Sequence, residues 1–130
     1  MRASPQTPAF WDEYYEKVTL NASSEPCYGL KLLWPHLRLG KVLDVAMGDG
    51  SNLVFLAQKG FAAEGIDFSP KAIEKCQARA ETAKVSVSAR VQNLDFFLMP
   101  LMKYDSVIMT YYKPQARILH TTLGSSVLVF

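Results

Sequence analysis

Two short stretches of this 130-residue chain carry residue types suited to binding a nucleoside. The first is Val42–Leu53 (VLDVAMGDGSNL), in which Gly48 and Gly50 follow a strand-like run and precede a helix-like one. Glycines let the backbone turn tightly and leave room for a ligand. The N-terminus of the following helix offers unpaired N–H groups and a positive dipole end. This order of strand, glycine loop and helix predicts a site for a carboxylate or a phosphate.

The second stretch ends at Asp67, 19 residues after Gly48 (67 − 48). In α/β folds, an acidic residue about 20 residues beyond the glycine turn binds the hydroxyls of an adenosine ribose. A carboxylate can accept both hydroxyl bonds at once. Each feature alone has a plainer explanation, either an ordinary strand-to-helix turn or an acid that starts the helix near Ser69. Their coincidence at this separation favours nucleoside binding.

The elements that must position these residues follow from local patterns. Short β-branched runs predict strands, and apolar residues at spacings of three and four predict helices. Ser69 followed by Pro70 is a strong helix start, whereas Pro35 bends or ends its helix early. The predicted strands are Lys41–Ala46, Ala62–Asp67, Val85–Val91, Asp105–Tyr111 and Ser125–Phe130, and the predicted helices are Phe10–Val18, Tyr28–Leu37, Asn52–Lys59 (capped by Gly60), Pro70–Lys84 and Pro114–Leu123. This alternation predicts an α/β fold with a parallel sheet.

Composition and charge narrow the class of protein. The chain is 49% hydrophobic and 20% charged, as in an ordinary globular domain, and its net charge of +2 with scattered basic residues gives no indication of nucleic acid or an anionic membrane. No apolar run approaches the ~20 residues needed to cross a bilayer, and residues 1–8 lack a signal pattern. Cys27 and Cys76 form neither a disulfide framework nor a metal spacing. We expect one cytoplasmic domain, 1–130, with residues 1–9 flexible and no bound metal.

At the glycine loop, the sequence resembles the class I S-adenosylmethionine-dependent methyltransferases of the small-molecule type. The first motif of that family is an acidic residue followed by small-x-Gly-x-Gly, and Asp44–Asn52 (DVAMGDGSN) is similar to it. Ala46 stands where glycine is more usual, which would crowd the amino-acid end of the cofactor. A nicotinamide dinucleotide site would place its first glycine directly after the strand. The pattern of Asp44 and Ala46 therefore disfavours a nicotinamide enzyme.

Further motifs extend this resemblance from about Phe10 to Phe130. GIDFSPKAIEKC is similar to the second motif of the family, in which Asp67 would hold the ribose. VQNLDFF resembles the adenine-binding segment, YDSVIMTYY the fourth strand facing the methionine part, and FWDEYYEK an aromatic helix that lids the cofactor. The resemblance implies S-adenosyl-L-methionine as cofactor, bound by Tyr15, Asp44, Ala46, Met47, Gly48, Gly50, Asn52, Asp67, Phe68, Asn93, Leu94 and Thr110.

The resemblance also implies the architecture. It is a Rossmann-like three-layer sandwich with a mainly parallel sheet of strand order 3-2-1-4-5. Family members normally continue beyond the fifth strand with a helix and an antiparallel pair of strands, so the resemblance implies that this sequence is truncated before them. Ser125–Phe130 would then present an exposed edge, which favours pairing with another chain. We therefore expect self-association through this last strand.

For function, the resemblance implies methyl transfer to a small-molecule acceptor. The alternative is a non-catalytic module that binds S-adenosylmethionine or a partner. No residue is predicted as catalytic, because the leaving thioether is neutral and positioning supplies much of the rate. His36 and His120 are expected to be ordinary surface residues. Tyr111 and Tyr112 follow the fourth strand. There, a role at the site, either a cation–π contact with the sulfonium or a wall of the acceptor pocket, and packing under the next helix are equally expected.

Overall fold

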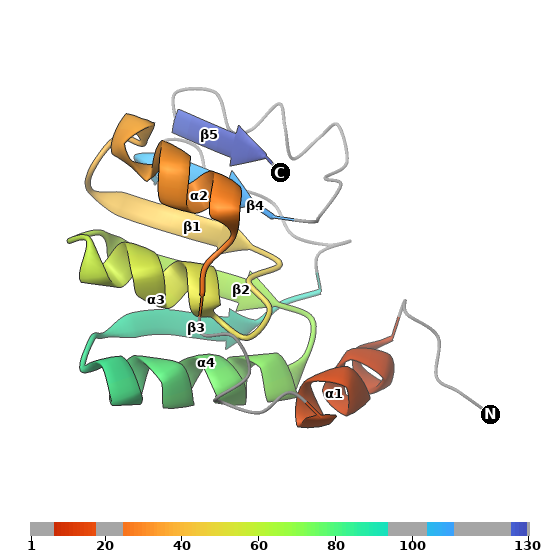
Figure 1. Cartoon of the computed structure of the whole chain (residues 1–130). Coiled ribbons are helices and arrows are strands. Elements are labelled where there is room, and N and C mark those ends of the chain that lie inside the picture. The colour runs from red at the N-terminus through yellow and green to blue at the C-terminus, as the bar shows by residue number, and fades with distance from the viewer. Residues whose placement is uncertain (1–6, 18–24, 94–103, 111–125, 130) are drawn as a thin grey trace.

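A computed structural model of the chain describes residues 7–17, 25–93, 104–110 and 126–129 (Figure 1). Its elements in chain order are α1 (Pro8–Lys17), α2 (Tyr28–Leu33), the 3₁₀ turn η1 (Trp34–His36), β1 (Lys41–Val45), α3 (Ser51–Gln58), β2 (Ala62–Asp67), α4 (Pro70–Ala83), β3 (Val87–Val91), β4 (Ser106–Met109) and β5 (Ser126–Val129). The predicted order of elements is confirmed throughout this part of the chain. The helix predicted over Pro114–Leu123 lies outside the described residues.

The five strands form one sheet in the order β3-β2-β1-β4-β5. Every neighbouring pair is parallel, which confirms the predicted fold class and strand order. In the register, Asp44 of β1 lies beside Gly65 of β2 and Ile108 of β4. Because the strands run in one direction, their carboxyl ends meet at a single edge of the sheet (Figure 1).

Two apolar clusters cover the two faces of the sheet. The face carrying α2, α3 and α4 (Figure 1) buries Val42 and Ala63 from the strands against Leu30, Leu53 and Cys76 from these helices. The other face buries a second cluster, made of Leu43, Val45, Ile66, Tyr104, Val107 and Met109, with Val127 packed against it. Alternate residues of β1 thus enter different clusters, which explains why its run is apolar without a polar alternation.

Local signals set the ends of the helices. The Ser69 hydroxyl accepts a hydrogen bond from the Ala72 N–H, and Pro70 follows at the first helical position, as predicted. Helix α2 ends at Leu33, and Pro35 lies inside the 3₁₀ turn that follows. Gly60 has a φ of 98° just beyond α3, the left-handed conformation that favours glycine after a helix. None of the helices in the described ranges is long and apolar enough to cross a membrane.

Helix α1 lies at the carboxyl edge of the sheet, beside the N-terminal end of α4 (Figure 1). Asp12 of α1 accepts hydrogen bonds from the Ser69 hydroxyl at 2.5 Å and from the Lys71 N–H at 3.1 Å. A carboxylate at the start of a helix satisfies unpaired N–H groups and complements the helix dipole. These contacts fix α1 next to the glycine loop.

Candidate functional site

The carboxyl edge of the sheet brings most of the predicted site residues together. Ala46 follows β1, Asp67 ends β2, Asn93 follows β3 and Thr110 follows β4. These strands are neighbours in the sheet. Crevices beyond the carboxyl ends of parallel strands are where open α/β sheets bind ligands. Leu94, Tyr111 and Tyr112 lie outside the described residues, so their predicted roles stay predictions.

The loop after β1 is built from left-handed backbone. Ala46, Gly48 and Gly50 have φ values of 60°, 59° and 84°. The Met47 N–H donates to the Ile66 carbonyl at 2.9 Å, and the Gly50 N–H donates back to the Met47 carbonyl at 3.2 Å. Such a conformation is costly for a residue with a β-carbon. The backbone at Ala46 is therefore strained, and a glycine at this position would avoid the strain.

Gly50 seats this loop directly on α4. A β-carbon added to Gly50 would meet Cys76, at 2.4 Å from its Sγ and 3.0 Å from its Cα. No side chain fits between the two backbones, which is why a glycine is required here. Burial raises the pKa of the Cys76 thiol to about 12, with smaller contributions from Asp44 and Asp49. The thiol therefore stays neutral and serves as packing.

Asp67 holds the loop from the neighbouring strand. Its Oδ2 accepts a hydrogen bond from the Gly48 N–H at 2.9 Å, and its Oδ1 accepts one from the Ser69 N–H at 3.0 Å. Both explanations of this residue thus have a structural counterpart, because Asp67 contacts the glycine loop and also the start of α4. Burial raises the pKa of its carboxyl, while the backbone bonds from Ser69 and Gly48 lower it.

Asp44 is the most unusual residue of the site. Its side chain is completely buried near the end of β1. Neither carboxylate oxygen has a hydrogen-bond partner among the described residues. Burial raises the pKa of Asp44 well above its usual value, and the nearby Asp67 carboxylate raises it further. A buried charge without a partner is costly. A cationic group beside Asp44 would offset this cost and favour its ionised form.

Tyr15 of α1 closes over the glycine loop. A β-carbon added to Gly48 would lie 2.9 Å from the Tyr15 hydroxyl oxygen. Burial raises the pKa of the Tyr15 hydroxyl, and the Asp67 and Asp49 carboxylates raise it further. The hydroxyl thus stays protonated beside acidic groups. Helix α1 therefore brings Tyr15 against the glycine loop, while its role as a lid over a cofactor stays a prediction.

Asn52 and Thr110 are bonded to each other. The Asn52 Nδ2 donates to the Thr110 Oγ at 3.1 Å, and the Asn52 Oδ1 accepts from the Cys27 N–H at 2.7 Å. One side chain therefore ties the start of α3 to the end of β4 and to the segment before α2. The family resemblance implied both residues as part of the site, but the bonds between them come from the fold.

The other predicted residues differ in what they expose. The Met47 side chain is buried in the apolar cluster, where it packs beside Gly65. Only the backbone of Met47 is therefore left to contact a ligand at the loop. Phe68 and Asn93 are half-buried at the carboxyl edge. The Asn93 carbonyl accepts a hydrogen bond from the Gln92 side chain at 3.3 Å. Binding by these residues stays a prediction.

Three polar residues at this edge were not predicted. Asp12 anchors α1, as described above. Arg79 of α4 donates from its Nη2 to the Asp49 Oδ2 at 3.0 Å, with only 6% of its side chain exposed. The sequence did contain one indication of this role for Arg79. It lies three residues after Cys76, which places a cation on the inward-facing side of α4. Asp49 stands between the two glycines of the loop, where no sequence rule assigns a role to its side chain.

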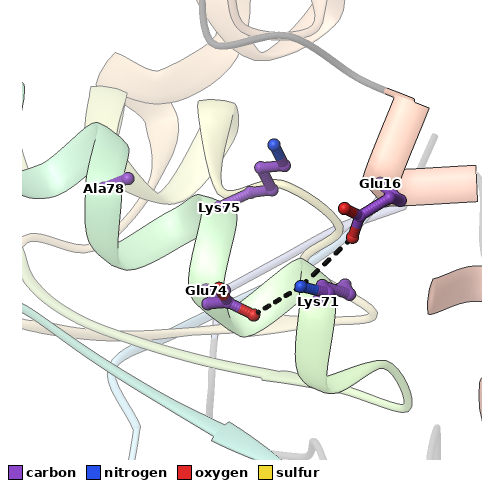
Figure 2. Close-up of a pocket in the computed structure, with 5 residues that line it drawn as sticks. All are labelled: Glu16, Lys71, Glu74, Lys75 and Ala78. Atoms are coloured by element: carbon purple, nitrogen blue, oxygen red, sulfur yellow. Dashed lines mark ion pairs between the residues drawn. The ribbon is translucent and has the colours of Figure 1, made fainter. Parts of the chain in front are cut away.

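A pocket between α1 and α4 lies apart from these residues. It is lined by Glu16, Lys71, Glu74, Lys75 and Ala78 (Figure 2). The Lys71 Nζ lies 3.1 Å from Glu16 and 3.3 Å from Glu74, and all three side chains are substantially exposed. Exposed ion pairs contribute little to stability. None of the predicted cofactor-binding residues lines this pocket, so we assign it no ligand.

The fold and the carboxyl edge define a Rossmann-like domain with a glycine loop and acidic strand ends. The chain belongs to the methyltransferase domain family, whose model matches residues 42–121. None of the curated protein sequences matches the chain.

Solved structures with the same fold include several methyltransferases. An S-adenosylmethionine-dependent methyltransferase from Thiobacillus denitrificans, in complex with S-adenosyl-L-homocysteine, has a TM-score of 0.71 at 22% identity, covering 99% of this chain and 56% of that one. The tRNA (uracil-54, C5)-methyltransferase of Pyrococcus abyssi, also with S-adenosyl-L-homocysteine, has a TM-score of 0.62 at 23% identity, covering 72% and 24%. A protein from work on converting a disulfide into a thioacetal in echinomycin biosynthesis has a TM-score of 0.70 at 22% identity, covering 81% and 47%. At these identities the likeness shows a shared fold, and the chain spans about half or less of each neighbour.

Proposed function

We propose that this protein binds S-adenosyl-L-methionine at the carboxyl edge of its sheet and transfers the methyl group to a small-molecule acceptor. The observation that carries the proposal is Asp44, a buried carboxylate without a partner among the described residues. It lies at the end of the strand that leads into the glycine loop. A cofactor with a sulfonium and an α-ammonium group would offset the cost of this charge.

The neighbouring residues fit the rest of such a cofactor. The Asp67 Oδ2 accepts the Gly48 N–H and its Oδ1 accepts the Ser69 N–H, and a carboxylate has further lone pairs with which it would accept a ribose hydroxyl. The Tyr15 hydroxyl lies directly over the left-handed backbone of Gly48, where a β-carbon would approach it to 2.9 Å, so Tyr15 would border the cofactor on this side. Phe68 and Asn93 follow β2 and β3, and in the proposed binding mode they would border the adenine.

When bound, the cofactor supplies an electrophilic methyl group on sulfur. The residues of this chain would bind the cofactor and orient it. Asp44 would contact its cationic end, Asp67 would hold its ribose, and Tyr15 would restrict the access of water. Holding two reactants in the correct geometry can contribute about 7–11 kcal/mol to catalysis. No base is assigned, because displacement from a sulfonium needs one only for a protonated acceptor.

A small molecule is proposed as acceptor because the chain has a net charge of only +2. Its basic residues are scattered along the sequence and do not form the basic cluster that is typical of nucleic-acid binding. The tRNA methyltransferase among the structural neighbours makes this worth testing. We also propose a cytoplasmic location, since Cys27 and Cys76, both in described positions, are thiols and not halves of a disulfide. Self-association through β5, an edge strand of the sheet, remains part of the proposal.

The test is calorimetric titration of the purified chain with S-adenosyl-L-homocysteine. We expect micromolar binding by the wild type and loss of binding in Asp67→Ala. Glu74→Ala, which removes an exposed carboxylate of α4, serves as the matched control and should bind as the wild type does. Competition by NAD with equal affinity would contradict the cofactor assignment, as would no binding by a folded wild type.

A turnover assay identifies the class of acceptor and distinguishes an enzyme from a non-catalytic binding module. Turnover is measured with thiol, amine and oxyanion acceptors and with transfer RNA. Methylation of a small molecule supports the proposal, whereas methylation of the RNA alone would overturn the acceptor class. Binding of S-adenosyl-L-homocysteine with no turnover on any acceptor would make the chain a non-catalytic binding module.

A further inference from the structure

Arg79 is a buried cation that the proposed cofactor site does not itself require. It lies on α4 among small inward-facing residues, Ala72, Cys76 and Ala80. Arginine is seldom buried without a partner, and here its Nη2 donates to the Asp49 Oδ2 at 3.0 Å. The paired side chains are 6% and 20% exposed, respectively. This ion pair joins α4 to the middle of the glycine loop.

Asp49 connects this cation to the backbone of the loop. Its second oxygen, Oδ1, accepts a hydrogen bond from the Ser51 N–H at 3.2 Å, at the first residue of α3. Asp49 therefore holds α4 with one oxygen and the start of α3 with the other. The residues on either side, Gly48 and Gly50, have no side chains with which to anchor the loop. Glycine backbone is permissive. The Gly48 N–H is held by Asp67 and the Gly50 N–H by the Met47 carbonyl, so the contact with Arg79 fixes Asp49, the residue that joins these two glycines.

A structural role alone is a weak explanation for this pair. Buried ion pairs can often be replaced by apolar residues of similar size without loss of stability. The loop is also packed tightly against Cys76 by Gly50 and bonded to Asp67 by Gly48. What the ion pair adds is a fixed position for Asp49, which lies between these two contacts, and for the start of α3. In the proposed binding mode, this part of the loop would face the amino-acid end of the cofactor.

We infer that Arg79 is a positioning residue: through Asp49 it sets the glycine loop in the orientation that binds the amino-acid end of the cofactor. The inference rests on the proposed function, since it needs a ligand with such an end. It predicts that loss of the ion pair weakens ligands that reach the loop and spares ligands that contact the adenosine side alone. Loss of stability by itself would weaken both kinds of ligand.

The experiment compares two ligands on the purified chain. S-adenosyl-L-homocysteine carries the amino-acid end, and 5′-methylthioadenosine lacks it. We expect Arg79→Met to weaken S-adenosyl-L-homocysteine at least tenfold, a loss of about 1.4 kcal/mol, and to change 5′-methylthioadenosine by less than twofold. Arg79→Lys should recover part of the loss because it keeps the charge. Lys75→Met, one turn earlier on the same helix, should bind both ligands as the wild type does.

Asp49→Asn supplies a second route should Arg79→Met fail to fold. It should show the same selective loss, and the double variant should be no weaker than either single one, because both act through one contact. Equal weakening of the two ligands, or unchanged binding of S-adenosyl-L-homocysteine in folded Arg79→Met, would overturn the inference while leaving the cofactor site intact. A folded wild type that binds neither ligand would overturn the proposed function, and the inference with it.

Discussion

Replacing Ala46 by glycine should make the protein more stable. Ala46 has a φ of 60°, and the left-handed conformation costs an L-residue roughly 1–2 kcal/mol. Glycine removes this cost but adds about 0.4–1 kcal/mol of unfolded-state entropy. The net gain is about 0.5–1 kcal/mol, or an increase in Tm of roughly 2–4 °C for a chain of this size.

Two other substitutions test the sign of this argument. Lys84, the C-cap of α4, also has a φ of 60°, so Lys84→Gly should stabilise by a similar amount far from the glycine loop. Ala78→Gly, inside α4, should instead destabilise by about 1 kcal/mol. The assay is urea unfolding followed by circular dichroism. S-adenosyl-L-homocysteine binding should tighten in Ala46→Gly, where crowding is relieved, and stay unchanged in Lys84→Gly.

The outcome that refutes this reasoning is specific. If Ala46→Gly unfolds at lower urea concentration while Lys84→Gly behaves as expected, then the alanine methyl makes a stabilising contact that outweighs the backbone strain. If both variants lose stability, the left-handed conformations themselves are not strained.

Three further substitutions probe the charges and packing around the site. Asp44→Asn should stabilise the ligand-free protein by about 1–3 kcal/mol near neutral pH and weaken S-adenosyl-L-homocysteine. Burial raises the folded-state pKa of Asp44, so the native state binds more protons than the unfolded state does. The free energy of unfolding of the wild type should therefore fall relative to that of the variant as pH rises from about 4. A difference in unfolding free energy that does not vary with pH would contradict this. Asp12→Ala removes the acceptor of the Ser69 hydroxyl and should cost about 0.5–2 kcal/mol, with faster amide exchange in α1 as the measurable sign. Gly50→Ala places a β-carbon 2.4 Å from the Cys76 Sγ and should destabilise by about 2–5 kcal/mol in urea unfolding, from overpacking and backbone strain together; wild-type stability would show that α4 yields.

Much of the fold was predictable because its signals are local. Ser69 and Pro70 mark the start of α4, Pro35 ends α2, and Gly60 follows α3, each through the conformations its own backbone allows. The five strands were predicted in order, and only their ends differ, by up to two residues. The parallel sheet followed from their alternation with helices.

The sequence by itself determined the order of elements, the glycine loop and the acidic residue placed about one βα unit later, because these depend on backbone preferences over a few residues. The tertiary structure decided which side chains share contacts. Arg79 meets Asp49 across 30 residues, Asn52 meets Thr110 across 58, and Asp12 meets Ser69 across 57. No local rule specifies such pairs, since each depends on how separate elements pack. Asp44, whose carboxylate has no hydrogen-bond partner among the described residues, likewise became visible only once the fold had buried it.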